Sequence, residues 1–362
     1  MRILYAIQGT GNGHLSRARD IIPLLQQKGD LDILVSGTQA DIKLPYPVTY
    51  TCRGLSFIFG KKGGIDLLET YKKSNLRNLF TEINQIPIDL YDLVINDFEP
   101  VSAWACYMRN KECISLSHQA AILNKKAPQP KHIDIVGKTI FKNYAPVTAR
   151  YGFHFKAYDN HIYTPVIRTQ IRNLQPVNNG HYTVYLPAYG DKRIIKVLGA
   201  CKDVRWDVFS KHSDKAFSEK NISIYPINNE HFIQSMASSA GVLCGAGFET
   251  PAEALHLQKK LMVIPMKNQF EQHCNAAALK ELGIPVLKSL KTKYADKITS
   301  WLESTARVSV HYPDETARII ETIFHEHTGH TRKLVIQPGH KAYTIKKFRE
   351  ISLKNILTQL AG

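Results

Sequence analysis

The feature that most constrains the fold is a glycine-rich loop that leads directly into a helix pattern in the second half of the chain. The apolar run Gly241–Cys244 ends in Gly245, Ala246 and Gly247, and the helix is predicted to begin at Thr250–Glu253. That start has the pattern of a capping box with proline at the first helical position. Free N–H groups and the helix dipole meet there and favour an anion. A capped helix without a ligand is the alternative.

The first half of the chain also alternates strand and helix patterns. Ile3–Ile7 is a buried-type apolar run, and Gln8–Gly13 leads into a helix predicted from about residue 14 to 28, with a kink or break at Pro23. Strand patterns alternating with helix patterns predict an α/β fold with doubly wound parallel sheets. Ligands of such sheets bind beyond the carboxyl ends of the strands. The residues at such ends are Gly11, Gly13, His14, Asp97 and His118.

The length of 362 residues predicts two domains, each large enough to bury a core. A stretch rich in Pro, Asn and Gly at 164–180 predicts a connection between them. We therefore expect a Rossmann-like domain at 1–165, a linker at 166–180, a second Rossmann-like domain at 181–335, and a C-terminal helix within 336–362 that packs back across the domains. Small-molecule sites usually lie in the cleft between two such domains.

Composition restricts the compartment and the partners. No apolar run approaches the roughly 20 residues of a membrane span, and the N-terminus does not have the pattern of a signal peptide, so we expect a cytoplasmic protein. Six scattered cysteines without a C-x-x-C pair argue against a zinc ribbon and suit a reducing compartment. The net charge of +16 fits nucleic acid, an anionic membrane surface or a phosphorylated substrate. Because the basic residues are spread out and no nucleic-acid motif occurs, we expect no nucleic-acid partner.

The loop Gly9–His14 invites comparison with a dinucleotide fingerprint. Its spacing is G-x-G-x-G rather than G-x-G-x-x-G, and the second strand ends in Val35–Gly37, where a ribose-binding acid would be expected. We therefore expect no NAD or FAD cofactor. His14 can serve as a general base because its pKa lies near working pH, although a helix residue without chemistry is the alternative. Asp97 could orient either His14 or His118, and the sequence does not choose between them.

Metal binding is not expected. Asp30–Asp32 is a D-x-D sequence, but it lies at the entrance of a strand, the wrong end for a ligand site. For His325, His327 and His330 a solvated loop is favoured over a metal site.

Taken together, these residues resemble the two-Rossmann-domain (GT-B) glycosyltransferases. The chain is most similar to the branch that contains the peptidoglycan lipid-intermediate N-acetylglucosaminyl transferase and the UDP-glycosyl and UDP-glucuronosyl transferases, and within it to a bacterial and archaeal subgroup. Gly9–His14 matches the G-x-G-G-H-type loop of that branch, and Thr164–Arg168 resembles its N-P-V-R linker. The most specific part is Gly245–Asn275. The chain departs from the pattern at Leu186–Gly190, where many relatives have a Gly-Gly-Ser-x-Gly turn.

The resemblance implies residue roles on the acceptor side and on the donor side. His14 would be the catalytic base with Asp97 as its partner, and Gly11, Gly13, His118 and Gln119 would lie on the acceptor side. Ser117-His118-Gln119 is similar to an H-E-Q triplet but lacks the Glu. On the donor side, Arg168 would approach the diphosphate, and Gly247 and Thr250 would contact its phosphates. Glu253 would bind the ribose, and Glu271 and Gln272 would contact the donor sugar. Three further residues belong to the same signature: Gly245, Phe248 and Asn275.

The resemblance also implies a reaction. We expect a hexosyl- or N-acetylhexosaminyl-transferring enzyme that moves a sugar from a nucleotide-diphosphate donor, UDP-linked, to an acceptor hydroxyl, with inversion and without a metal or other cofactor. The acceptor would be a lipid, a glycan or a small molecule, in cell-envelope or glycolipid biosynthesis. Peripheral contact with an anionic membrane, at the inner face of the plasma membrane, stays open. So do two alternatives: a nucleotide-sugar 2-epimerase or hydrolase on the same architecture, and a non-catalytic sugar-nucleotide-binding protein.

Overall fold

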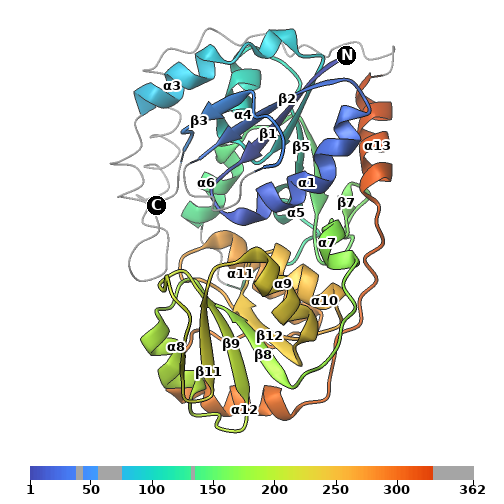
Figure 1. Cartoon of the computed structure of the whole chain (residues 1–362). Coiled ribbons are helices and arrows are strands. Elements are labelled where there is room, and N and C mark those ends of the chain that lie inside the picture. Colours follow the sequence, from blue (N-terminus) through green and yellow to red (C-terminus); the bar gives the residue numbers. More distant parts are fainter. Residues whose placement is uncertain (38–43, 56–75, 132–134, 329–362) are drawn as a thin grey trace.

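The computed structural model describes residues 1–37, 44–55, 76–131 and 135–328. Over these residues the chain forms two α/β domains, each built on a parallel or mainly parallel sheet (Figure 1). The two-Rossmann-like fold class predicted from the sequence is therefore confirmed. The helix predicted within 336–362, with its packing across the domains, lies outside the described residues.

The first sheet has seven parallel strands in the order β3-β2-β1-β4-β5-β6-β7. Residues Ile3–Ile7 of β1 are fully buried, because helices cover both faces of a parallel sheet. The strands are β1 Arg2–Gln8, β2 Asp30–Ser36, β3 Tyr50–Cys52, β4 Leu93–Asp97, β5 Ile114–Ser117, β6 Ala149–Phe153 and β7 Ile162–Tyr163. The accompanying helices are α1 Asn12–Gln26, α3 Leu76–Gln85, α4 Pro100–Met108, α5 His118–Ile122 and α6 Ile135–Tyr144, with a 3-10 turn at Ile88–Leu90.

The second sheet has the order β10-β11-β9-β8-β12-β13, and only the edge strand β10 is antiparallel to its neighbour. Its strands are β8 His181–Tyr185, β9 Arg205–Ser210, β10 Phe217–Glu219, β11 Ile222–Pro226, β12 Gly241–Gly245 and β13 Lys260–Ile264. The helices that follow β7 in the chain are α7 Thr169–Arg172, α8 Asp191–Leu198, α9 Asn229–Ser238, α10 Glu249–His256, α11 Phe270–Glu281, α12 Ala295–Glu303 and α13 Thr316–Thr328, with a 3-10 turn at Thr292–Tyr294. Helices α9, α10 and α11 lie at the end nearer the first domain (Figure 1).

Each sheet has one point where the strand order reverses. In the first sheet it lies between β1 and β4, and in the second between β8 and β12. A crevice opens at the carboxyl ends of the strands at such a point, and ligands of open α/β sheets bind there. The glycine loop after β1, Asp97 at the end of β4, and the loop after β12 all lie at these two points.

Two local predictions about helix starts and breaks require correction. Of the kink or break predicted at Pro23, the break does not occur: helix α1 continues through Pro23, because Ile21, Ile22 and Leu25 on its inner face are fully buried and that packing offsets the lost backbone hydrogen bond. The capping box predicted at Thr250–Glu253 is wrong, because α10 already begins at Glu249 and has no side-chain cap.

The last described helix belongs with the first domain, although its residues fall in the range expected for the second. Helix α13 packs against α1, and Lys28 of α1 forms an ion pair with Glu321. At its end the His327 ring contacts the Tyr151 hydroxyl at 2.9 Å and Glu112 Oε1 at 2.9 Å. His325 and His327 are thus helical rather than in the solvated loop expected from the sequence, because Ile319, Ile320, Ile323 and Phe324 bury the inner side of this helix.

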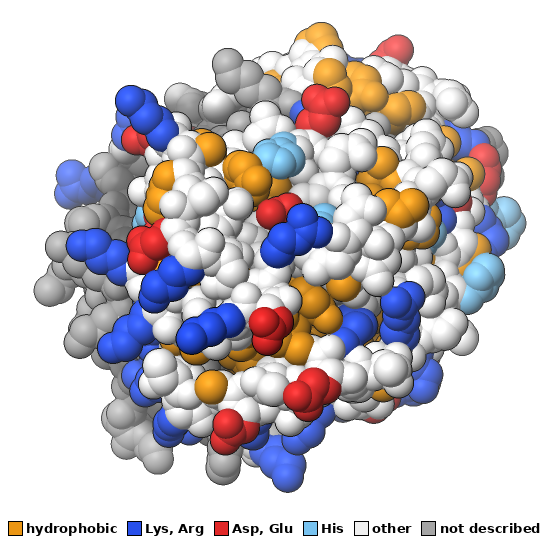
Figure 2. Space-filling view, turned by 60° about the horizontal axis from the view of Figure 1, so that its bottom comes forward, with side chains coloured by type: hydrophobic (Ala, Val, Ile, Leu, Met, Phe, Trp, Pro, Cys, Tyr) orange, Lys and Arg blue, Asp and Glu red, His pale blue; other side chains and the backbone are white. Residues whose placement is uncertain are grey.

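Two surface properties bear on partners. Figure 2 shows Lys and Arg side chains spread over the face at the bottom of Figure 1, with acidic side chains among them, rather than gathered in one patch. In the described part of the chain, none of the helices has the length and apolar character needed to cross a bilayer.

Candidate active site

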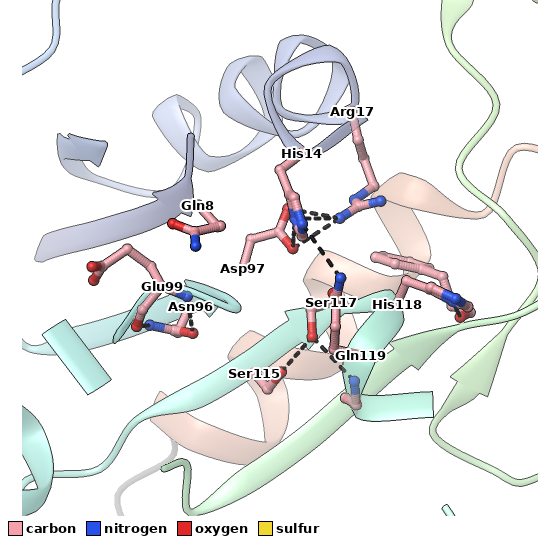
Figure 3. Close-up of polar contacts among 12 residues, drawn as sticks. Gln8, His14, Arg17, Asn96, Asp97, Glu99, Ser115, Ser117, His118 and Gln119 are labelled. Carbon is pink, nitrogen blue, oxygen red and sulfur yellow. Dashed lines mark hydrogen bonds and ion pairs between the residues drawn. The ribbon is translucent and has the colours of Figure 1, made fainter. Parts of the chain in front are cut away.

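The first group of candidate residues gathers at the switch point of the first sheet. His14 on α1 contacts Asp97 at the end of β4, with 2.9 Å between Nδ1 and Oδ1. Asp97 accepts, so the neutral ring carries its proton on Nδ1 and leaves Nε2 as the basic nitrogen. The sequence left open which histidine Asp97 serves, and the structure places it against His14. Figure 3 shows His14 and Arg17 extending from α1 toward Asp97.

Arg17 completes this group, and the sequence prediction missed it. Its Nη2 donates to both carboxylate oxygens of Asp97 at 2.8 Å and lies 3.3 Å from His14 Nδ1. Burial alone would raise the pKa of Asp97, but Arg17 and His14 outweigh burial and hold that pKa below its usual value. The available signal was spacing, since residues three apart share a helix face.

Gln119, the second residue of α5, lies between the two domains. Its side-chain nitrogen is 3.3 Å from His14 Nε2 and 3.2 Å from Glu271 Oε2 on α11. The two protons of one amide group can satisfy both contacts if His14 Nε2 accepts, which agrees with the tautomer that Asp97 selects. Burial raises the pKa of Glu271. Gln119 thereby connects Glu271, which is expected to contact the donor sugar, with His14, which is expected to be the base.

His118 does not face the cleft in this structure. Its Nδ1 lies 2.7 Å from the carbonyl oxygen of Phe153 and its Nε2 lies 2.7 Å from Asn275 Oδ1. The ring stacks on Phe248 of the second domain at 3.7 Å between centroids. The Asn275 amide also donates to the carbonyl of Ala246. His118, Phe248 and Asn275 therefore form a buried contact between the domains, which the sequence had divided between an acceptor side and a donor side.

Arg168 and Glu253 are bonded to each other. Arg168 Nε and Nη2 donate to Glu253 Oε1 at 2.5 Å and Oε2 at 2.9 Å, and Nη1 donates to Asn229 at 2.9 Å. Only 7% of Arg168 and 2% of Glu253 is exposed. Glu253 was expected to bind the ribose and Arg168 the diphosphate. In this arrangement both carboxylate oxygens of Glu253 accept hydrogen bonds from Arg168 instead.

Glu249, the first residue of α10, is a second residue that the sequence prediction missed. Its carboxylate forms an ion pair with Arg17 Nη1, across the domain boundary. A Cβ added at Gly13 would lie 3.0 Å from Glu249 Cγ, so the glycine loop and the Glu249 side chain approach each other closely. Burial raises the pKa of Glu249 to about 7, against the opposing charge of Arg17.

A cavity of about 80 Å³ lies at the switch point of the second sheet. Its walls include four residues of the predicted donor set, Gly245, Gly247, Thr250 and Gln272. The opposite wall is the turn that departs from the family pattern, in which Pro187 has no N–H to donate and Tyr189 N–H is bonded to the carbonyl of Leu186. The lining residues are Tyr185, Leu186, Pro187, Ala188, Tyr189, Gly245, Gly247, Thr250, Ile264, Met266 and Gln272.

Among the described residues, His, Cys, Asp and Glu side chains nowhere gather in a group of three or more that could hold a metal ion.

Comparisons with known proteins agree with this architecture. The model of the family described as glycosyl transferase family 1 matches residues 1–305. No curated protein sequence matches the chain. Among solved structures, MurG of Acinetobacter baumannii aligns with a TM-score of 0.54 at 13% identity, over 90% of this chain and 99% of that one. UGT89C1 of Arabidopsis thaliana, solved with UDP, aligns with a TM-score of 0.54 at 13% identity, over 98% and 99%. The spinosyn rhamnosyltransferase SpnG aligns with a TM-score of 0.51 at 14% identity, over 91% and 96%.

Proposed function

The chain belongs to glycosyl transferase family 1, and from that premise we propose that it transfers a hexosyl or N-acetylhexosaminyl group from a UDP-sugar to an acceptor hydroxyl, with inversion and without a metal. The observation that carries the proposal is the His14–Asp97 pair on one domain, joined through Gln119 and Glu271 to the domain whose helix start lines a cavity.

His14 is the proposed base. Asp97 holds its Nδ1–H, so the lone pair on Nε2 is available for the proton of the acceptor hydroxyl. Gln119 contacts this nitrogen at 3.3 Å, so it has to give way to the acceptor or donate to the acceptor oxygen instead. The glycines at 11 and 13 allow the acceptor to approach without side-chain obstruction.

The reaction forms one bond and breaks another at the anomeric carbon of the donor sugar. The acceptor oxygen attacks this carbon, its proton passes to His14 Nε2, and the bond to the phosphate oxygen breaks with release of UDP. The start of α10, with Gly247 and Thr250, would stabilise the growing negative charge on the leaving diphosphate. Glu271 and Gln272 begin α11 beside the same cavity and are the proposed contacts for the donor sugar.

The proposal extends to the donor base and the location. UDP is favoured because one of the similar structures was solved with UDP. The acceptor is a lipid, a glycan or a small molecule. We propose a cytoplasmic enzyme, with peripheral contact at the inner face of an anionic plasma membrane if the acceptor is a lipid.

The first test is the thermal stability of the protein with UDP, GDP, dTDP, CDP, ADP and NAD. A ligand that binds only the folded state raises the midpoint by mass action, by roughly a few degrees near saturation. A shift with one nucleoside diphosphate supports the donor site and selects the nucleotide-sugars to test. A shift with NAD alone, or no shift at all, contradicts the proposal. Turnover of a UDP-sugar without any acceptor would instead indicate a hydrolase or epimerase.

A further inference from the structure

Arg17 is a buried cation at the boundary between the two domains. Its side chain is 1% exposed and lies three residues after His14. One side of the guanidinium is committed to Asp97 through Nη2, while Nη1 points across the boundary to Glu249. Its Nε is buried without a hydrogen-bond partner. Because a buried donor without a partner is costly, this guanidinium has capacity for a further acceptor.

Glu249 is the most exposed member of this group. Its side chain is 19% exposed, in contrast to 1% for Arg17 and none for Asp97. It is the first residue of α10 but does not cap that helix. Its carboxylate pairs with Arg17 and does not accept from the free N–H groups of the helix start. The residues on either side of it in the chain are Phe248, held by His118, and Thr250, which lines the cavity.

The charges around this point oppose a diphosphate unless one acid moves. Asp97 and Glu253 are each bonded to an arginine by both carboxylate oxygens and are less than 3% exposed, so neither can leave. Each of the three guanidinium nitrogens of Arg168 donates a hydrogen bond to Glu253 or Asn229. Of these arginine–carboxylate pairs, only the one between Arg17 and Glu249 has a partner that can turn toward solvent.

We propose that the Glu249 carboxylate occupies the position on Arg17 that the donor diphosphate takes when the nucleotide binds. The diphosphate then replaces Glu249, and Arg17 becomes a phosphate ligand contributed by the acceptor-side domain. The inference rests on the proposed function, since it requires a nucleotide-diphosphate donor. It also accounts for the phosphate turn that this chain lacks: Pro187 removes a backbone donor from one wall of the cavity, and Arg17 supplies charge from the other domain.

The exchange makes nucleotide affinity depend on pH in a defined direction. The charged or titratable groups that face Glu249 come from three elements packed around it and from its own helix. They are Arg17 and His14 of α1, Asp97 of β4, Tyr5 of β1, and Glu253 one turn further along α10. Ionised Glu249 competes with phosphate for Arg17 and protonated Glu249 does not. Since burial raises the pKa of Glu249 to about 7, competition grows as the pH rises from 6 to 8.

The test is calorimetric titration of the full chain with UDP, comparing wild type with Glu249→Gln. The glutamine amide is of equal size but cannot compete with phosphate as an anion. We therefore expect UDP to bind about tenfold more tightly at pH 7.5, because one competing charge-assisted hydrogen bond to Arg17 is lost. UDP itself gains a proton near pH 6, so the pH effect is measured as the difference between the two proteins, and this difference should shrink from pH 8 to pH 6. Arg17→Gln should weaken UDP binding, and adding Glu249→Gln to it should bring no gain.

Asp20→Asn is the matched control. It removes the same charge from the same boundary between the domains, but Asp20 contacts Thr169 and not Arg17, so UDP affinity should change less than twofold. Equal gains in Glu249→Gln and Asp20→Asn would reduce the effect to general electrostatics and overturn the inference. So would unchanged or weaker binding by folded Glu249→Gln. If wild type binds no nucleoside diphosphate, the proposed function fails first, and this result is distinct from the others.

Discussion

Replacing Glu253 by alanine should destabilise the protein strongly, whatever its effect on nucleotide. The substitution removes a carboxylate that is 2% exposed and leaves Arg168, 7% exposed, with Asn229 as its remaining side-chain partner. Removing one partner of a buried ion pair typically costs about 3–5 kcal/mol, because the other charge stays buried without compensation. At about 2–4 °C per kcal/mol, the midpoint of thermal unfolding should fall by roughly 6–20 °C.

The assay is thermal unfolding followed by circular dichroism, with the double variant Glu253→Leu/Arg168→Met as control. Removing both charges leaves no isolated ion, so the double variant should lie closer to wild type than Glu253→Ala does. A single variant that unfolds within 2 °C of wild type, or a double variant that is less stable than the single one, would refute the reasoning. Titration of the double variant with UDP then measures what the Arg168–Glu253 pair contributes to nucleotide binding, separately from its contribution to stability.

Three further predictions address the base, the packing under it and the pH dependence of stability. Asp97→Asn should lower the transfer rate by about 10²–10⁴-fold with near-normal substrate affinity, because an amide lets His14 adopt the wrong tautomer. The rate is measured in a steady-state assay, and a loss of less than tenfold would exclude His14 as the base. Gly152→Ala should destabilise the protein by about 2 kcal/mol in urea unfolding, since its Cβ would lie 2.6 Å from the backbone nitrogen of Ala121 in α5; wild-type stability would contradict this packing. Burial lowers the pKa of His154 from 6.5 to about 3, so below pH 6.5 the unfolded chain takes up a proton that the folded chain does not. The free energy of unfolding should therefore fall by roughly 1.4 kcal/mol per pH unit more than in His154→Leu, and equal slopes for the two proteins would count against a buried neutral ring.

The fold and the neighbourhood of the site were predictable because they follow from local patterns. Apolar runs such as Ile3–Ile7 read as buried strands without knowledge of their neighbours, and the strand–helix alternation implies parallel sheets. Parallel strands bring all their carboxyl ends to one edge, so the approximate position of His14, Asp97 and Gly247 follows as well.

The same local reasoning failed where a distant group competes for a residue. Thr250 and Glu253 have the spacing of a capping box, but Glu253 is bonded to Arg168, 85 residues away. Arg17 shares a helix face with His14, but neither it nor Glu249 carries a pattern that pairs one with the other. They lie 232 positions apart in the chain, and only the folded structure brings them into contact.

The sequence by itself determined that strands alternate with helices in both halves of the chain, that the sheets are mainly parallel, and which loops lie at the ligand edge, because hydrophobic periodicity and glycine placement act over a few residues. Only the tertiary structure decided that Asp97 serves His14 rather than His118, that His118 lies against Phe248 and Asn275, and that an arginine of one domain meets a carboxylate of the other. These pairings depend on strand order and on how two domains meet, and both are set by the summed packing of residues far apart in the chain.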